Sequence, residues 1–269
     1  MVDKSKRPKV ILRRCDAPDP VRVAAIVKEG FEELGIRPHG RVLIKPNVVT
    51  ANKKYIHHSF THPGVTEGIV STLRGFGEVN DITIGESSAF GIPPGLFAHE
   101  AGYDKLAARI GVRLVDFNQD ASDWTELKRA KYQTAFNVPR SISRADFKIW
   151  APKLKYHICC QVTNALKLNI GILQHRDRMA CHDDRLDDKI VDLLEIGWPD
   201  VVVTDATVIG HGFESAPQAF PSASFSSRTT RSQRTQSRAS RSATSRRRSN
   251  IYAKRTSAAT ALFRSATLM

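Results

Sequence analysis

The chain has 269 residues, is 41% hydrophobic and 25% charged, and carries a formal charge of +14 at pH 7. These values fit a folded globular protein and exclude collagen-like, mucin-like and wholly disordered classes. The sequence has no run approaching the roughly 18 uncharged apolar residues that span a bilayer, and its amino terminus lacks the apolar stretch of a secretory signal. We therefore expect a cytoplasmic protein with no membrane partner.

The first 215 residues alternate predicted strands and helices. The first half gives strands and helices in turn over residues 9–14, 19–35, 41–47, 61–76, 81–87, 96–110 and 112–117. A small β excursion at 124–143 is followed by a buried strand at 146–153, a segment that Thr163 can cap, a helix at 184–196 and an apolar strand at 200–210. This alternation predicts an α/β fold with a doubly wound, mostly parallel sheet and helices on both faces.

The alternation stops near residue 216, and the excess positive charge lies beyond that point. From residue 215 to 269 there are ten Arg, one Lys and no Asp or Glu, so the rest of the chain has 30 basic against 27 acidic residues. A Ser/Arg-rich segment of this kind cannot bury a core. We predict an α/β domain at 1–215 whose C-terminal part is missing or disordered, and a disordered basic tail at 216–269. Nucleic-acid binding through the tail is an alternative function, although any Arg-rich tail attracts phosphate adventitiously.

Polar residues follow the carboxyl ends of several predicted strands, where open α/β sheets bind their ligands. They are lysines and neutral hydrogen-bonding residues: Lys45, Asn47, Ser87, Lys153, Lys155, Thr163, Lys167 and Asn169. Ammonium groups attract negative charge and the other groups orient it, so the pattern predicts a site for a small anionic ligand. Glu86 and His157 are the candidates for proton transfer in an enzyme. Solvated lysines at strand ends and a helix cap at Thr163 are the competing explanations.

A cluster of His and Cys residues raises the possibility of a metal site. His157, Cys159, Cys160, His175, Cys181 and His182 fall within a short span. Their spacing matches no zinc or iron–sulfur motif, so we assign no metal ligand. Buried cysteines acting as small hydrophobic residues are the simpler explanation, and a redox or metal accessory domain stays open as an alternative.

Six segments, taken in order, resemble one protein family: VLIKPNVV (42–49), THPGV (61–65), TIGESSAFG (83–91), AGYDKLAARIGVRLVDFN (101–118), PKLKYH (152–157) and VTNALKLNIGI (162–172). This succession is similar to the bacterial and archaeal family catalogued as domain of unknown function 362. The resemblance implies an α/β domain with no general assigned reaction, so whether the chain is an enzyme stays open. Some members carry ferredoxin-type modules. Because this chain lacks the ferredoxin cysteines, the resemblance implies an iron–sulfur partner protein.

The family motifs fall on the candidate site residues. Its KPN motif matches residues 45–47, and its PKLKTH motif matches residues 152–157 with Tyr156 in place of Thr. Its T-x-x-x-K-N-x-x-G pattern matches Thr163, Lys167, Asn169 and Gly171, with Leu168 inserted between Lys and Asn.

The basic tail stands where the family continues with a segment like DPVAVDAVA. Combining the last base of each codon with the first two of the next converts Ser codons to Val, Ile, Leu or Phe, and Arg codons to Ala, Pro, Ser or Thr. Read in this way, TRSQRTQSR at 230–238 permits DPVAADAVA. We therefore predict that residues 216–269 are an out-of-frame product of the same gene.

Overall fold

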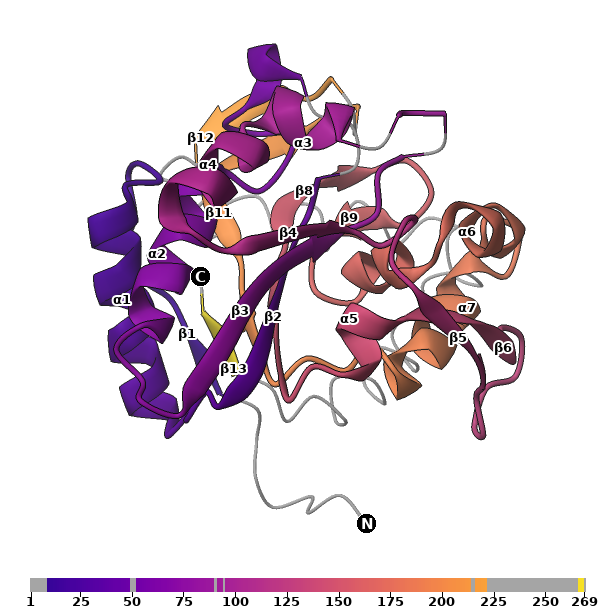
Figure 1. Ribbon diagram of the computed structural model, residues 1–269. Helices are drawn as coiled ribbons and strands as arrows, with labels where there is room; N and C mark the ends of the chain where they lie inside the picture. Colours follow the sequence, from indigo (N-terminus) through magenta and orange to yellow (C-terminus); the bar gives the residue numbers. More distant parts are fainter. Residues whose placement is uncertain are drawn as a thin grey trace.

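The protein is built around one parallel sheet. A computed structural model describes residues 9–48, 52–89, 91–93, 95–213, 216–221 and 266–268. Over these residues the sheet has seven strands in the order β1-β13-β10-β7-β2-β3-β4 (Figure 1). The strands are β1 (Val10–Ile11), β2 (Gly40–Pro46), β3 (Val79–Glu86), β4 (Arg113–Asp116), β7 (Phe147–Ala151), β10 (Val201–Val203) and β13 (Ala266–Leu268). The predicted α/β class is confirmed.

The strand order changes direction between β2 and β7. The chain passes from β2 to β3 and β4 on one side of β2, and β7 and β10 lie on the other side. In doubly wound sheets, the carboxyl ends of the strands that flank such a switch point form the ligand-binding crevice. Here those ends are Pro46 of β2 and Ala151 of β7.

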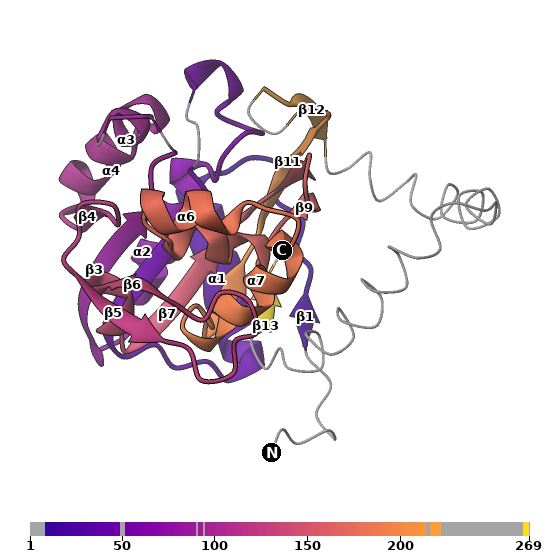
Figure 2. The ribbon, with the colours of Figure 1, turned by 90° about the vertical axis from the view of Figure 1, so that its right-hand side faces the viewer.

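Helices cover both faces of the sheet (Figures 1 and 2). One face packs against α1 (Pro20–Leu34) and α2 (Pro63–Leu73), which bury Phe31 and Ile69 against it. The other face packs against η2 (Lys167–Ile172), α6 (His175–Cys181), α7 (Leu186–Asp192) and η3 (Leu193–Glu195). Fully burying one large aliphatic or aromatic side chain stabilises the fold by about 1.5–3 kcal/mol, so these two cores hold the layers together.

Helix α1 begins and ends at signals present in its sequence. The Asp19 side chain accepts a hydrogen bond from the backbone N–H of Arg22, and Pro20 occupies the first helical position. At the other end Gly35 takes a φ of 67°, a left-handed conformation that costs glycine little. The predicted bounds of this helix are therefore confirmed.

Two predicted strands are each divided between two sheets. The segment at 146–153 breaks at Pro152 into β7 and β8 (Lys153–His157), because proline has no N–H to continue the ladder. The segment at 200–210 breaks after β10 and continues as β11 (Asp205–His211). Strands β8 and β11 join β9 (Gln161–Thr163) and β12 (Gln218–Pro221) in a second sheet of order β12-β11-β8-β9.

The structure refines three further predictions about individual elements. The helix predicted at 96–110 is divided into α3 (Leu96–Ala101) and α4 (Tyr103–Ile110), because Gly102 between them has a φ of 78°. The β excursion at 124–143 is an antiparallel hairpin of β5 (Ser122–Glu126) and β6 (Ala135–Pro139), followed by α5 (Arg140–Ser143). Thr163 is not a helix cap, since it lies in β9 and no side chain caps η2.

Two short strands, β12 and β13, belong to the segment predicted as a tail, and β13 lies between β1 and β10. Residues 222–265 lie outside the described part of the chain, so the predicted disorder of the tail and its proposed contact with nucleic acid stay predictions. Among the described residues, no helix has both the length and the apolar character needed to cross a bilayer.

Candidate functional site

Two predicted site residues meet at the carboxyl ends of β2 and β3. The Nζ atom of Lys45 lies 2.7 Å from Oε1 of Glu86, and the two side chains are 0% and 3% exposed. Glu86 also accepts hydrogen bonds from the backbone N–H groups of Ser87 and Val48, at 2.8 and 3.1 Å. The carboxylate is therefore fixed in one orientation beside a single ammonium group.

Gly171 of η2 closes over this ion pair. A Cβ atom at position 171 would lie 2.4 Å from Oε1 of Glu86 and 2.5 Å from Nζ of Lys45. Only a residue without a side chain allows η2 to pack this closely. The glycine that ends the family pattern therefore lies directly against the Lys45–Glu86 pair.

Burial acts against both charges of the pair. It raises the pKa of the Glu86 carboxyl and lowers the pKa of the Lys45 amine, while the contact between the two groups opposes each shift. The ionised and neutral forms of the pair are thus closer in free energy than they are for an exposed Lys–Glu pair. Such a pair is suited to exchanging a proton with a bound molecule.

A second buried ion pair lies where the two sheets join. Lys153 Nζ is 3.0 Å from Asp205 Oδ1, and both side chains are 0% exposed. Asp205 also accepts hydrogen bonds from the backbone N–H of His62 at 3.0 Å and from the hydroxyl of Thr207 at 2.7 Å. Burial lowers the pKa of Lys153, and Asp205 opposes that shift. The sequence analysis did not predict Asp205 as a site residue. Like the predicted lysines, however, it follows the carboxyl end of an apolar strand, in this case β10.

His62 lies beside this second pair but is held neutral. Its Nδ1 atom accepts a hydrogen bond from the N–H of Gly64 at 3.0 Å, at the start of α2. Burial lowers its pKa to about 4, more than the nearby Asp205 carboxylate raises it. His62 therefore acts as a helix cap at neutral pH.

The remaining buried candidates surround the two pairs. Lys155 donates to the carbonyl oxygen of Ser59 at 2.6 Å and is the cross-strand partner of Thr163. The N–H of Asn47 donates to the Thr61 hydroxyl, which in turn donates to the carbonyl oxygen of Ala151 on β7. These contacts connect the end of β2 with the end of β7 at the switch point.

Asn169 and Lys167 come from η2. The Oδ1 atom of Asn169 accepts a hydrogen bond from the indole N–H of buried Trp150 at 2.9 Å. Half-buried Lys167 is close enough to Lys45 to lower its pKa, although less than burial does. Lys167 and Asn169 therefore both lie at this end of the sheet, although Leu168 is inserted between them relative to the family pattern.

His157, a candidate for proton transfer, lies at the carboxyl end of β8. It ends β8 four residues beyond Lys153, about 13 Å along an extended strand. Its Nδ1 atom accepts hydrogen bonds from the N–H groups of Cys159 and Cys160, at 3.1 and 3.3 Å. These bonds fix the turn between β8 and β9, and a role of His157 in proton transfer stays a prediction.

Arg178 of α6 belongs to the site but was not predicted. Its side chain is buried, and its guanidinium donates to the carbonyl oxygen of Ser88 at 2.8 Å. Burial lowers the pKa of Arg178, and the Glu86 and Asp116 carboxylates oppose that shift. Ser87, a predicted ligand residue, instead donates its hydroxyl to the carbonyl oxygen of Leu173 at 3.0 Å.

Several buried polar atoms at this end of the molecule have no hydrogen-bond partner among the described residues. They are Asn47 Oδ1, Ser59 Oγ, Thr163 Oγ1, Asn169 Nδ2 and Arg178 Nε, and Lys153 Nζ makes no well-directed hydrogen bond besides its ion pair. Native proteins satisfy most buried polar atoms with protein groups or ordered water, so such a concentration needs an explanation.

The buried charges are also unequal. At this end of the molecule, four buried cations, Lys45, Lys153, Lys155 and Arg178, stand against two buried anions, Glu86 and Asp205, which leaves an excess of two positive charges among the described residues. A fifth buried cation, Lys189 of α7, is paired with Asp183. Half-buried Lys167 and Asp116 carry opposite charges and leave this difference unchanged.

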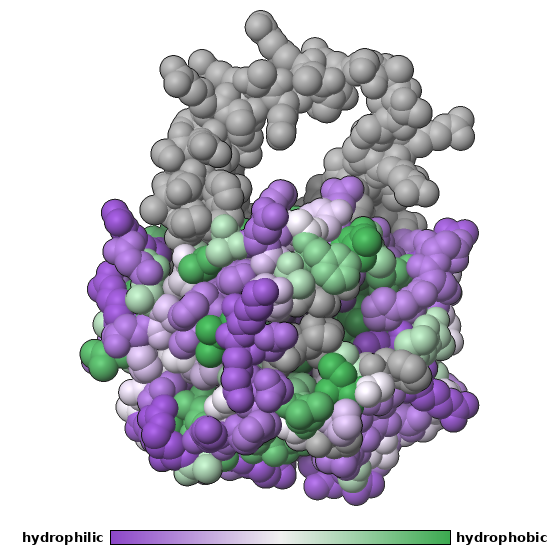
Figure 3. All heavy atoms as spheres, turned by 90° about the horizontal axis from the view of Figure 1, so that it is seen from above, coloured by the Kyte–Doolittle hydropathy of each residue, from purple (hydrophilic) through white to green (hydrophobic). Residues whose placement is uncertain are grey.

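Seen from above, the end of the molecule that carries α3 and β12 shows hydrophilic and hydrophobic residues interspersed (Figure 3).

The His and Cys residues do not form a cluster of metal ligands within the described ranges, where no three His, Cys, Asp or Glu side chains come together suitably. Burial raises the pKa of the Cys160 thiol to about 12 and that of Cys181 to about 11, whereas Cys159 is exposed. A thiol with a raised pKa is a poor metal ligand and a poor nucleophile.

The fold and this site define a doubly wound α/β domain with a buried polar cluster at its switch point. The chain belongs to the family described as "Domain of unknown function (DUF362)", which matches residues 42–223. It is also similar to the "Thylakoid-associated protein sll1697" of Synechocystis sp. (strain ATCC 27184 / PCC 6803 / Kazusa), with 24% identity over 219 residues. That match covers 76% of this chain and 64% of the relative, so the chain spans less than two thirds of the relative's length.

Proposed function

We propose that this domain binds a small anionic ligand at the carboxyl ends of β2 and β7. The observation that carries the proposal is the excess of two buried positive charges at this end of the described part of the chain, together with donors on Ser59, Thr163 and Asn169 that have no partner among the described residues. The switch-point position supports it, because doubly wound sheets bind their ligands there.

The physical argument is one of charge compensation. Lys45 and Lys153 each have a carboxylate partner, whereas the Arg178 guanidinium donates to the carbonyl oxygen of Ser88 and shares the Glu86 carboxylate with Lys45 as a nearby charge. An uncompensated buried charge is costly, and a bound anion removes that cost while accepting hydrogen bonds from the unpartnered donors. The alternative is that a buried lysine loses its proton, which leaves the unpartnered donors unexplained.

The residues then take different roles. Lys155 and Arg178 supply attraction, and the Thr163 hydroxyl and the Asn169 amide supply direction. Glu86 is the group we assign to proton exchange with the ligand, because burial raises the pKa of its carboxyl. Binding is the function proposed, and a proton-transfer reaction would extend it.

Calorimetric titration of the full chain with inorganic phosphate and with acetate, at low salt, tests the proposal. Thr163→Val removes the unpartnered hydroxyl with little change in volume, and Thr125→Val makes the same change in the β5–β6 hairpin. A hydrogen bond to a charged group contributes about 1.5–3 kcal/mol, so Thr163→Val is expected to weaken binding by roughly tenfold or more. Absence of binding by both anions, or equal affinities of the two variants, would contradict the proposal.

A further inference from the structure

A pocket lies at the amino-terminal ends of the strands, opposite to the end that carries the site described above. Its volume is about 300 Å³, and it is lined by the amino-terminal halves of β2 and β3, the first residue of β4, residues 120–121, and α5 with the two residues that follow it. Arg41 at this end and Lys45 at the other are four residues apart on β2, which corresponds to about 13 Å. The pocket is therefore separate from the site described above.

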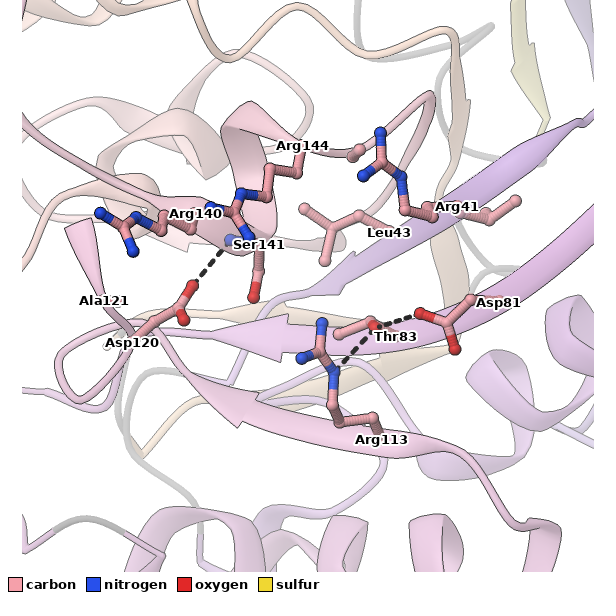
Figure 4. Close-up of a pocket in the computed structure, with 12 residues that line it drawn as sticks. Arg41, Leu43, Asp81, Thr83, Arg113, Asp120, Ala121, Arg140, Ser141 and Arg144 are labelled. Carbon is pink, nitrogen blue, oxygen red and sulfur yellow. Dashed lines mark hydrogen bonds between the residues drawn. The ribbon is translucent and has the colours of Figure 1, made fainter. Parts of the chain in front are cut away.

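Charged side chains of both signs line the pocket: Arg41, Arg113, Arg140, Arg144, Asp81 and Asp120 (Figure 4). Two of these arginines are already neutralised by carboxylates. Arg41 donates through Nε and Nη2 to Asp146, at 2.8 and 2.9 Å. Arg140 donates in the same two-pronged way to Asp123. Neither guanidinium needs a further anionic partner.

The other two arginines are open toward a ligand. Arg113 donates through Nε to the Thr83 hydroxyl at 3.2 Å, and its two terminal nitrogens make no hydrogen bond within the described part of the chain. The Arg144 guanidinium makes no hydrogen bond or ion pair with any described residue. Figure 4 shows Arg113 extending from β4 on one side and Arg144 on the α5 side, with Leu43 and Thr83 between them.

Two carboxylates balance these two open cations. Asp120 uses Oδ2 to accept the N–H of Ser141 at 2.7 Å, and Asp81 accepts the Thr83 hydroxyl at 3.3 Å, so each keeps one oxygen available. Once the Arg41 and Arg140 pairs are set aside, the lining carries two positive and two negative groups. A simple anion would be attracted by the arginines and repelled by the carboxylates, whereas a molecule with both charges is attracted by groups of both signs.

We propose that this pocket binds a small zwitterion of the α-amino acid class. The carboxylate lies against Arg113 and Arg144, whose guanidinium edges suit two-pronged recognition of a carboxylate. The ammonium group lies against Asp120, because Asp81 lies on the other side of the Arg113 guanidinium (Figure 4). Apolar lining from Leu43, Ala121 and Ala145 favours an apolar side chain on the ligand.

Three probes of matched shape test this assignment by calorimetry and ligand-observed NMR on the full chain. L-leucine carries both charges, 4-methylpentanoate lacks the ammonium, and 3-methylbutylamine lacks the carboxylate. L-leucine is expected to bind roughly tenfold more tightly than either fragment, because each charged contact it adds contributes on the order of 1.4 kcal/mol. No binding of L-leucine, or equal binding of 4-methylpentanoate, would overturn the proposal.

Variants locate the binding. Arg144→Gln and Asp120→Asn are each expected to weaken L-leucine binding several-fold, while Arg37→Gln, at an exposed arginine outside the pocket, leaves it unchanged. Arg144 is exposed, so the fold of that variant is expected to persist, and its thermal denaturation checks this. Unchanged affinity in Arg144→Gln would refute the proposal, and phosphate binding at the other end of the strands is independent of this result.

Discussion

Replacing Lys45 with methionine removes one ammonium group and keeps a long unbranched side chain in the core. Glu86 is then left as a buried carboxylate whose partners are the N–H groups of Ser87 and Val48. Breaking a buried ion pair by removing one partner costs about 3–5 kcal/mol. Because two backbone donors still stabilise the carboxylate, we expect a loss near 3 kcal/mol at pH 8.

The loss is expected to depend on pH. Lys45 is the group that most lowers the pKa of Glu86, so without it the carboxyl has an even higher pKa in the folded protein. An acid whose pKa is higher folded than unfolded stabilises the fold at low pH, and this contribution disappears as pH rises through the folded pKa. The Lys45→Met variant is therefore expected to be closer to the parent protein at pH 5 than at pH 8.

Urea unfolding followed by tryptophan fluorescence measures both effects. Lys45→Met combined with Glu86→Gln removes the uncompensated charge, and we expect this double variant to regain much of the stability lost in the single one. Lys105→Met, at an exposed helix position, is the matched control and is expected to change stability by less than about 0.5 kcal/mol. A loss below about 1 kcal/mol at pH 8, or an equal loss at both pH values, would refute the buried-pair reasoning.

Three further predictions concern single positions. Alkylation at pH 8 followed by mass spectrometry is expected to modify exposed Cys159 well before Cys160, whose pKa is raised to about 12, and equal rates would count against this burial. The His62 ring is expected to stay neutral in NMR titrations down to its pKa of about 4. Because the unfolded chain binds this proton near pH 6.5, His62 lowers the stability of the fold as pH falls below 6.5. A titration midpoint near 6.5 in the folded protein would be inconsistent with its burial. Gly85→Ala places a Cβ atom 2.3 Å from the ring of Phe117 and is expected to lower the free energy of urea unfolding by about 1–3 kcal/mol. Gly77→Ala, where the added Cβ has nothing within 4 Å, serves as the control. Equal stabilities of the two variants would show that the core accommodates the methyl group.

Much of the fold follows from local signals in the sequence. The Asp19 cap and the Gly35 stop define α1, and alternating apolar segments define the parallel strands. The division of two strands between two sheets was not predicted, because continuous apolar runs do not show where a sheet ends. Pro152 was the available signal, and its carbonyl oxygen accepts the N–H of Asp205 at 2.8 Å where both strands break.

The candidate site was predictable only where it follows strand ends. Lys45 and Glu86 were expected to meet because parallel strands end at a common edge, and they lie 2.7 Å apart. Arg178 comes from a short helix far along the chain, and its contact with the carbonyl oxygen of Ser88 depends on how α6 packs. His157 carries a suitable side chain, and its Nδ1 atom accepts hydrogen bonds from two N–H groups of its own turn, which sequence spacing does not reveal.

The change of reading frame near residue 216 is still a prediction. Residues 222–265 lie outside the described ranges, and the family match ends at residue 223. Sequencing the coding DNA, with mass spectrometry of the carboxyl terminus, tests it. A single intact frame through codons 214–230 would contradict the prediction.

An anomalous-scattering crystal structure of the full chain soaked in selenate tests the central claim most directly. Charge compensation predicts a selenium peak at the ends of β2 and β7, within hydrogen-bonding distance of the Lys155 ammonium, the Thr163 hydroxyl or the Asn169 amide. Ordered water at these three groups, with selenate bound only elsewhere, would contradict the proposed anion site.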